Sequence, residues 1–178
     1  MGRPVDHARR ARLLDAAVDV VVTNGLTDLS LRPLAAALDV STSTLTHHFG
    51  SKDRLVHAVL DRIRDRLRLD ALDGPVPLPI AFERIWRHGS DPRNEAYFRT
   101  FFAAYGQALQ HPERFEVFLR GVVDDWRLAL AESSGRQADD PAVTLAIATF
   151  RGLLLDLLTT ADRPRVARAA DAYATSIA

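Results

Sequence analysis

Residues 29–55, LSLRPLAAALDVSTSTLTHHFGSKDRL, decide the fold that this sequence predicts. Ser30 can cap a first short helix, because the N–H groups of a first helical turn have no partner within the helix. Apolar residues at helical spacing mark one buried face of this helix: Leu31, Leu34, Ala35 and Leu38. Asp39 and Val40 then interrupt the pattern, which predicts a tight turn at this point.

The second predicted helix exposes side chains that suit a groove. Ser41 can cap it, and its buried positions would be Leu45 and Phe49. Its outward positions carry hydrogen-bonding side chains and no carboxylate: Thr42, Ser43, Thr46 and His47. A helix in the DNA major groove needs donors and acceptors that reach base edges and phosphates. The pattern favours a helix–turn–helix that binds DNA, and the alternative is a solvated surface helix of an ordinary bundle.

The residues after the second helix add a candidate phosphate site. Gly50 can end that helix, and Ser51 can cap the next one. Lys52 then lies in a first helical turn, where free N–H groups and the helix dipole already favour a phosphate. Arg32, at the start of the first helix, can bind a guanine or a phosphate, or can be a plain surface arginine.

Residues 44–55, TLTHHFGSKDRL, resemble the tetracycline-repressor (TetR) family of bacterial transcription regulators. That family has a Thr-Leu-Tyr-x-His-Phe-like run followed by Ser-Lys-acidic-x-Leu. Thr46 stands where the family usually has a phosphate-contacting Tyr, and Asp39 stands where its turn usually has Gly. Asp tolerates a left-handed backbone, so we expect the turn to persist. We expect DNA contacts at Ser30, Arg32, Ser41, Thr42, Ser43, Thr44, Thr46, His47, His48 and Lys52.

Composition narrows the possible chemistry. The 178 residues include 23 Lys and Arg and 23 Asp and Glu, so a DNA-binding chain of this kind must concentrate its positive charge locally. The absence of cysteine excludes disulfides, thiol nucleophiles and Cys-based zinc sites. His47 and His48 are adjacent, and side chains at adjacent helical positions point about 100° apart and do not readily share one ion. We expect neither a metal nor a cofactor.

Two further protein classes are not expected. The chain has no apolar signal segment and no uninterrupted run of about eighteen apolar residues, so we expect a soluble cytoplasmic protein without a membrane partner. It also lacks a Gly-rich phosphate loop, a Ser nucleophile elbow and a paired His-Glu motif, so we do not expect an enzyme.

The amino-terminal part begins with a basic segment. Residues 1–8 predict a flexible arm, and apolar spacing predicts a helix over residues 9–24, which Gly25 can end. The arginines of this region could lie along DNA phosphates or could belong to a solvated terminus: Arg3, Arg9, Arg10 and Arg12.

A linker separates two predicted domains. A long amphipathic helix should run from Lys52 to about residue 72. The segment DGPVPLP at 73–79 cannot continue that helix, because it holds three prolines and a glycine. We therefore predict a DNA-binding head with its connecting helix at residues 1–72, and a regulatory and dimerisation domain at residues 73–178.

The second domain should be entirely helical and rich in aromatic residues. Prolines suited to a first helical turn predict helices at 79–89, 92–110, 112–134 and 141–160, with a last helix at 163–177. Aromatic residues at helical spacing are often plain core, but together they allow an apolar pocket. A pocket for a flat or hydrophobic small molecule is also what the family resemblance implies, and we predict that it involves Trp86, Phe101, Tyr105, Phe118, Trp126 and Phe150.

The segment LAIATFRGLLLDLL at 145–158 is apolar almost all round, so it must be covered on more than one side. With the helix that follows, it resembles half of the four-helix dimer interface that is usual in the family. We predict that this interface involves Ile147, Leu154, Leu158, Val166, Ala170 and Tyr173. The alternative is that these residues are buried in the core of the monomer.

The sequence thus predicts an all-α protein with a three-helix helix–turn–helix domain and a helical ligand-binding and dimerisation domain. We expect a homodimeric regulator, most simply a repressor, that binds a near-palindromic double-stranded DNA site and is released by a small-molecule effector. The alternative is a helical module that binds a small molecule or a protein partner without productive DNA binding.

Overall fold

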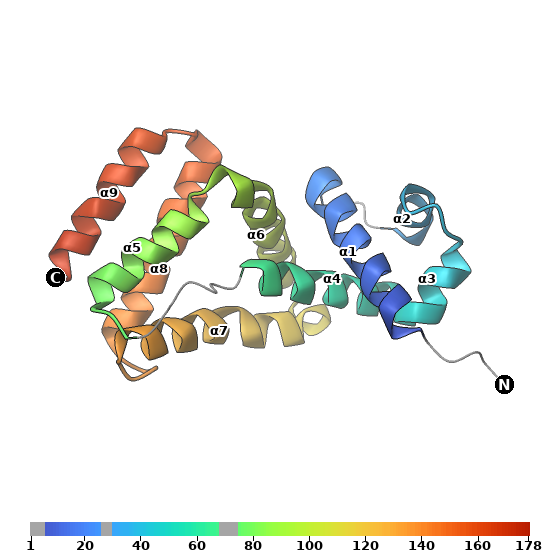
Figure 1. The fold of residues 1–178 in the computed structure, drawn as a ribbon, viewed down its shortest axis with the longest axis horizontal. Coiled ribbons are helices and arrows are strands. Elements are labelled where there is room, and N and C mark those ends of the chain that lie inside the picture. Colours follow the sequence, from blue (N-terminus) through green and yellow to red (C-terminus); the bar gives the residue numbers. More distant parts are fainter. Residues whose placement is uncertain (1–5, 26–29, 68–74) are drawn as a thin grey trace. The chain divides into compact units, whose positions relative to one another are not determined.

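The computed structural model describes residues 6–25, 30–67 and 75–178, and within these ranges the chain forms helices and no strand (Figure 1). The amino-terminal helices are α1 (His7–Asn24), α2 (Leu31–Ala37), α3 (Thr42–Phe49) and α4 (Lys52–Leu67). They are followed by α5 (Leu78–Gly89), α6 (Glu95–Gln110), α7 (Glu116–Ser134), α8 (Pro141–Thr160) and α9 (Arg163–Ser176). Short 3-10 turns precede α6 and α7, at Pro92–Asn94 and Pro112–Arg114. The predicted all-α fold class is confirmed.

Side-chain caps determine where several helices begin. The Asp6 carboxylate accepts a hydrogen bond from the Arg9 N–H at 2.9 Å, so α1 begins at His7, within the predicted arm. Ser41 accepts from the Thr44 N–H at 3.1 Å and starts α3, as predicted. Ser30 holds the N-cap position of α2 with an extended backbone, but its side chain makes no capping hydrogen bond.

Proline and acidic caps define the later helices. Asp140 accepts from the Ala142 N–H at 2.8 Å before Pro141, and Asp162 accepts from the Arg165 N–H at 3.2 Å. The observed bounds of α5 and α9 differ from the predicted ones by one residue, and those of α8 are the predicted ones. The predicted end of the helix after Lys52 falls in residues 68–74, outside the described part of the chain.

The chain divides into two compact units. The first unit comprises Met1–Leu67 and Arg99–Leu119, and the second comprises Arg68–Phe98 and Arg120–Ala178. This division differs from the predicted single domain boundary at residue 72, because most of α6 and the start of α7 group with the amino-terminal helices. Within the first unit, for example, the rings of His57 and Phe115 lie 6.3 Å apart.

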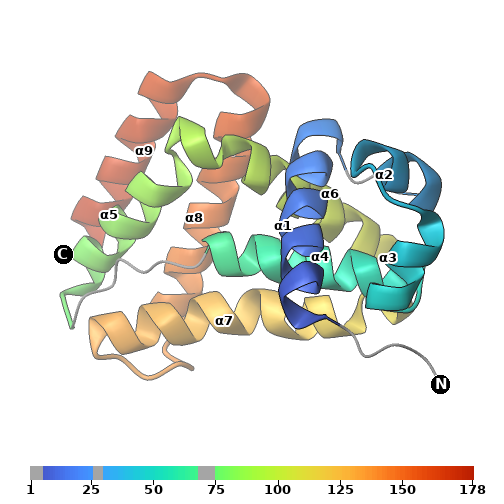
Figure 2. The same ribbon diagram turned by 45° about the vertical axis from the view of Figure 1, so that its right-hand side comes forward.

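The core of the first unit lies mainly between α1 and α4 (Figures 1 and 2). Its buried side chains include Val18 of α1, Leu45 of α3 and Val59 of α4. Ion pairs join the same two helices at their edge, where Arg66 contacts Asp19 at 2.7 Å and Asp15 at 3.1 Å. α4 is therefore fixed to α1 by both apolar packing and charge.

The core of the second unit is formed where α5, α8 and α9 pack against one another. The residues predicted for the dimer interface lie inside this core. Tyr173 is half-buried, and its ring lies 4.6 Å from that of Phe82. The other five residues are at most 7% exposed: Ile147, Leu154, Leu158, Val166 and Ala170. The three residues on α8 and the three on α9 pack within this unit, together with α5, which favours the alternative that they belong to the core of the monomer.

The opposite side of α8 remains apolar and exposed. Leu145 is 60% and Leu155 is 47% exposed, and Ala148 and Gly152 lie on the same face. By length and composition α8 could span a bilayer, since its most apolar window has a mean hydropathy of 1.6 and is 39% buried. Core helices of soluble proteins have the same character, and the buried face of α8 packs against its neighbours in this way.

Gly89 provides a test of the packing in the second unit. A methyl group at Gly89 would lie 2.5 Å from Cε2 of Phe150, whose ring is held against Trp126 and Phe98. Gly89→Ala should therefore lower the free energy of unfolding in urea by about 1–3 kcal/mol. Gly106→Ala in α6 is the control, because its methyl group would meet nothing within 4 Å. Equal stability of Gly89→Ala and the wild type would contradict this packing.

Candidate nucleic-acid interface

The turn between α2 and α3 depends on Asp39. Its backbone is left-handed, with φ of 51°, as the sequence predicted for an Asp in place of Gly. The Val40 N–H donates to the Ala35 carbonyl at 2.9 Å, which ends α2 and directs the chain into α3. The helix–turn–helix geometry is therefore formed without a glycine in the turn.

The first residues of α3 form a network of hydroxyl groups. The Ser41 hydroxyl lies 2.7 Å from that of Ser43 and 2.9 Å from that of Thr44. One turn later, the Thr46 hydroxyl donates to the Thr42 carbonyl at 3.0 Å. These bonds fix the hydroxyl groups at the start of the helix.

The exposed face of α3 is the one that the sequence predicted. Leu45 and Phe49 are buried, while Thr42, Ser43, Thr46 and His47 are exposed, and α3 contains no carboxylate. Thr44 is half-buried and contributes mainly to the cap. Ser30, Arg32, Ser41 and Lys52 are also at least partly exposed, so their side chains are available to a ligand.

His48 is the exception among the predicted DNA contacts. Its side chain is only 9% exposed, and its Nδ1 has no hydrogen-bond partner. Burial lowers the pKa of the imidazole, and the positive charges of His47, Arg9 and Arg10 lower it further. His48 is therefore packed and does not share the exposed face of α3, and its contact with DNA stays a prediction.

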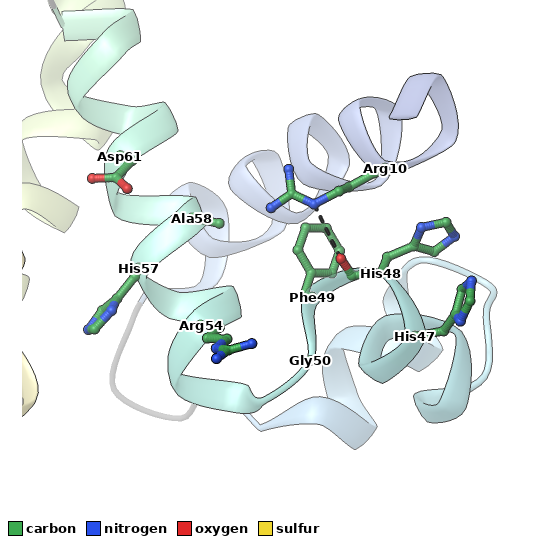
Figure 3. Close-up of a pocket in the computed structure, with 9 residues that line it drawn as sticks. All are labelled: Arg10, His47, His48, Phe49, Gly50, Arg54, His57, Ala58 and Asp61. Carbon is green, nitrogen blue, oxygen red and sulfur yellow. Dashed lines mark hydrogen bonds between the residues drawn. The ribbon is translucent and has the colours of Figure 1, made fainter. Parts of the chain in front are cut away.

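Arg10 holds the end of α3 in place, a role that sequence reasoning did not assign to it. Its Nε donates to the His48 carbonyl at 3.2 Å, and its guanidinium carbon lies 5.0 Å above the Phe49 ring (Figure 3). The contact combines a cation–π interaction with a charged hydrogen bond to one of the last carbonyls of α3. In the sequence, Arg10 is marked only as one of several arginines of the basic amino-terminal segment.

Ion pairing separates two groups of basic residues on the first four helices. Near the end of α4, Arg62 and Arg66 pair with Asp15 of α1, and Arg64 pairs with Asp61. A second group of basic residues lies at the starts of α1, α2 and α4 and forms no ion pair with any described residue: Arg9, Arg10, Arg12, Arg32, Lys52 and Arg54. The positive charge without a counter-ion is therefore concentrated at helix starts, as an overall neutral DNA-binding chain requires.

The predicted ligand-binding residues fall into separate groups. In the second unit, the rings of Trp126 and Phe150 lie 5.4 Å apart, and both contact Phe98. In the first unit, Phe118 lies 5.9 Å from Phe101 and 6.4 Å from Tyr105. The remaining predicted residue, Trp86, is half-buried on α5. The six aromatic residues therefore do not line one pocket within a single unit.

Residues 13–59 match the sequence model of a family described as bacterial regulatory proteins, tetR family. Over 80 residues the chain is 39% identical to the HTH-type transcriptional repressor Rv3405c of Mycobacterium tuberculosis, a match that covers 44% of this chain and 42% of that protein. The match thus spans about two fifths of the length of the first curated relatives. A regulator named BetI from Brucella anthropi is 25% identical over 93% of this chain and 89% of its own length.

Solved structures are similar over nearly the whole chain. The multidrug binding protein EbrR in complex with imidazole has a TM-score of 0.71 and 26% identity, covering 97% of this chain and 92% of that one. Its complex with proflavin gives a TM-score of 0.68 and 25% identity, over 96% and 99% of the two chains. A transcriptional regulator from Rhodococcus sp. Rha1 has the same fold, with a TM-score of 0.77 at 24% identity over 94% and 95%. The helix–turn–helix part of this chain is therefore that of the TetR family of bacterial regulatory proteins, and the fold of the whole chain is similar to that of solved regulators.

Proposed function

We propose that this chain is a homodimeric transcriptional repressor that binds double-stranded DNA through α3 and is released by a small aromatic ligand. The observation that carries the proposal is the charge around α3. Its exposed face bears hydroxyl and imidazole groups without a carboxylate, and basic residues without ion-pair partners among the described residues lie at the starts of α1, α2 and α4. This combination suits a helix in the major groove with phosphates on either side.

Each exposed side chain then has a distinct role. Thr42, Ser43, Thr46 and His47 reach base edges in the groove. Thr46 replaces a longer tyrosine, and its hydroxyl already donates to the helix backbone, so its methyl group is suited to contact a thymine methyl. Lys52 and Arg32 bind phosphates on either side, and these contacts set the register of α3 in the groove.

A second copy of the chain should pack on the exposed face of α8. Leu145, Ala148, Gly152 and Leu155 follow one another at spacings of three and four residues, which places them on one side of the helix. The small residues in the middle allow another helix backbone to approach closely. A two-fold dimer would place two recognition helices in successive major grooves about 34 Å apart, on a near-palindromic site.

The ligand site is proposed to lie around the rings of Phe98, Trp126 and Phe150 in the second unit. Flat rings in this arrangement suit a flat aromatic guest, and EbrR, a protein of similar fold, is known in complex with proflavin. α6 and α7 each have residues in both units, so a ligand that displaces them in the second unit also acts on the first. A ligand that prefers one arrangement would thereby lower the affinity of the dimer for DNA.

The DNA-binding proposal is tested by selecting bound duplexes from a random DNA pool and titrating the best duplex at several salt concentrations. We expect a two-fold-symmetric consensus and a steep fall of affinity with salt. Lys52→Gln should weaken binding about tenfold and reduce the salt slope by about 1, because one phosphate contact is lost. Arg168→Gln, on α9, removes an equal charge as the control and should bind like the wild type. Enrichment of no sequence would refute the proposed DNA binding.

The ligand proposal is tested by adding proflavin to the complex with the selected duplex. Proflavin should weaken DNA binding of the wild type by a factor of about 5 to 150, the usual range of coupling between two sites. A flat dye also stacks between base pairs, so Trp126→Leu is the essential control. That variant should bind the duplex normally and lose the response to proflavin. Equal release of both proteins would place the effect on the DNA alone.

The dimer proposal is tested by sedimentation velocity of the chain without DNA. Leu155→Glu introduces a charge on the exposed face of α8 and should convert the dimer to a monomer, since an unpaired charge is costly in an apolar interface. Leu109→Glu, at a leucine of α6 that is 68% exposed, is the matched control and should remain dimeric. A dimer that persists in Leu155→Glu would show that another surface mediates association.

A further inference from the structure

A hollow of about 550 Å³ opens beside the corner between α3 and α4 (Figure 3). Its lining includes Arg10 from α1, Arg54 from α4, imidazoles from both α3 and α4, and the ring of Phe49. None of the ligand-binding residues predicted from the sequence lines it. The hollow is therefore distinct from the aromatic groups described above.

Arg10 forms one side of this hollow and is held rigidly. Its Nε is engaged by the His48 carbonyl, and its guanidinium group lies over Phe49. Among the described residues, no carboxylate pairs with it, and none accepts a hydrogen bond from its two terminal amino groups. Arg10 is thus a fixed cation with donors to spare.

Arg54 provides a second cation from a different helix. Its backbone N–H is bound by the Ser51 hydroxyl at 3.2 Å, while its guanidinium forms no ion pair with any described residue. The Arg54 side chain lies beside the Gly50 corner, where a Cβ on Gly50 would be at an ordinary van der Waals distance of 3.4 Å from its Cδ and Nη1. Figure 3 shows Arg10 on α1 and Arg54 on α4, with the ring of Phe49 between them.

The acidic group of the hollow does not neutralise these cations. Asp61 is the one carboxylate of its described lining, and it pairs with Arg64 at 3.5 Å. Two guanidinium groups therefore face the same space without a counter-ion from the described residues. Like charges that face one space repel each other, and the attraction of each cation to a bound anion would offset this repulsion.

We propose that this hollow binds a phosphate group, held by Arg10 and Arg54. Guanidinium groups match the geometry of phosphate oxygens through pairs of parallel N–H bonds, and two such groups can contact different oxygens of one phosphate. The phosphate belongs either to DNA lying beside α3 or to a free phosphorylated molecule, for which the volume beyond one phosphate leaves room. Only the DNA source rests on the proposed function.

The first test measures phosphate binding by the full-length chain without DNA. Sodium phosphate is titrated against sodium chloride of equal ionic strength, and the Nε–Hε resonances of arginine are followed by ¹H–¹⁵N NMR. The Arg10 and Arg54 resonances should shift saturably with phosphate and not with chloride. Arg54→Gln should abolish the saturable shift of Arg10, and Arg12→Gln, which removes a nearby arginine outside the hollow, should retain it.

The second test identifies the source of the phosphate. Single phosphates of the selected duplex are replaced by neutral methylphosphonates, and affinity is measured for the wild type and Arg54→Gln. If DNA supplies the phosphate, one replacement should weaken wild-type binding about tenfold and leave Arg54→Gln unaffected. If the NMR shift is saturable but no single methylphosphonate weakens wild-type binding in this way, the hollow binds a free phosphorylated molecule.

The proposal is overturned if phosphate produces no saturable shift and no single methylphosphonate distinguishes the wild type from Arg54→Gln. Failure of the proposed function has a different signature. In that case no duplex is selected, and the NMR titration alone decides whether the hollow binds phosphate.

Discussion

The contact of Arg10 with the end of α3 joins α1 directly to the helix whose exposed face carries the proposed DNA contacts. Phe49 is buried at the last position of α3, and the same guanidinium covers its ring and binds the preceding carbonyl. A helix of eight residues is too short to be stable alone in water. Its position must come from tertiary contacts, and Arg10, Leu45 and Phe49 provide them. The exposed hydroxyl groups of α3 are consequently presented by a helix that is fixed on its inner side.

The two halves of α4 carry basic residues with different roles. The arginines in its second half are committed to α1 or to a neighbouring turn, through Asp15, Asp19 and Asp61. The basic residues in its first turn, Lys52 and Arg54, have no such partner among the described residues. One helix can therefore anchor the unit at one end and attract an anion at the other. Overall neutrality does not argue against nucleic-acid binding when the charges are arranged in this way.

The sequence predicted what is decided locally, and it failed where the choice of face is decided by packing. Asp39 in the turn, the Ser41 cap and the proline starts were predictable, because each acts within a few residues of itself. The buried side of α8 was not, because that helix is apolar all round and its periodicity does not distinguish Ile147 from Leu145. The burial of His48 depends on how α3 rests against the rest of the first unit, which no pattern within α3 specifies. The grouping of residues 99–119 with the head likewise arises only from long-range contacts.

The same immobilisation that fixes α3 also prepares Arg10 for an anion. Binding normally costs about 0.5–1.5 kcal/mol of conformational free energy for each flexible side chain that becomes ordered. The Nε bond and the Phe49 ring have already ordered the Arg10 side chain in the free protein, so this cost is met during folding. Arg54 lacks such restraints, because only its backbone N–H is bound among the described residues, by the Ser51 hydroxyl. The two cations therefore have different roles: the Arg10 side chain is already ordered before the anion binds, and the Arg54 side chain adjusts to the anion. A phosphate held between α1 and α4 would in turn strengthen the contact that positions α3, which couples occupancy of the hollow to the geometry of the exposed hydroxyl face.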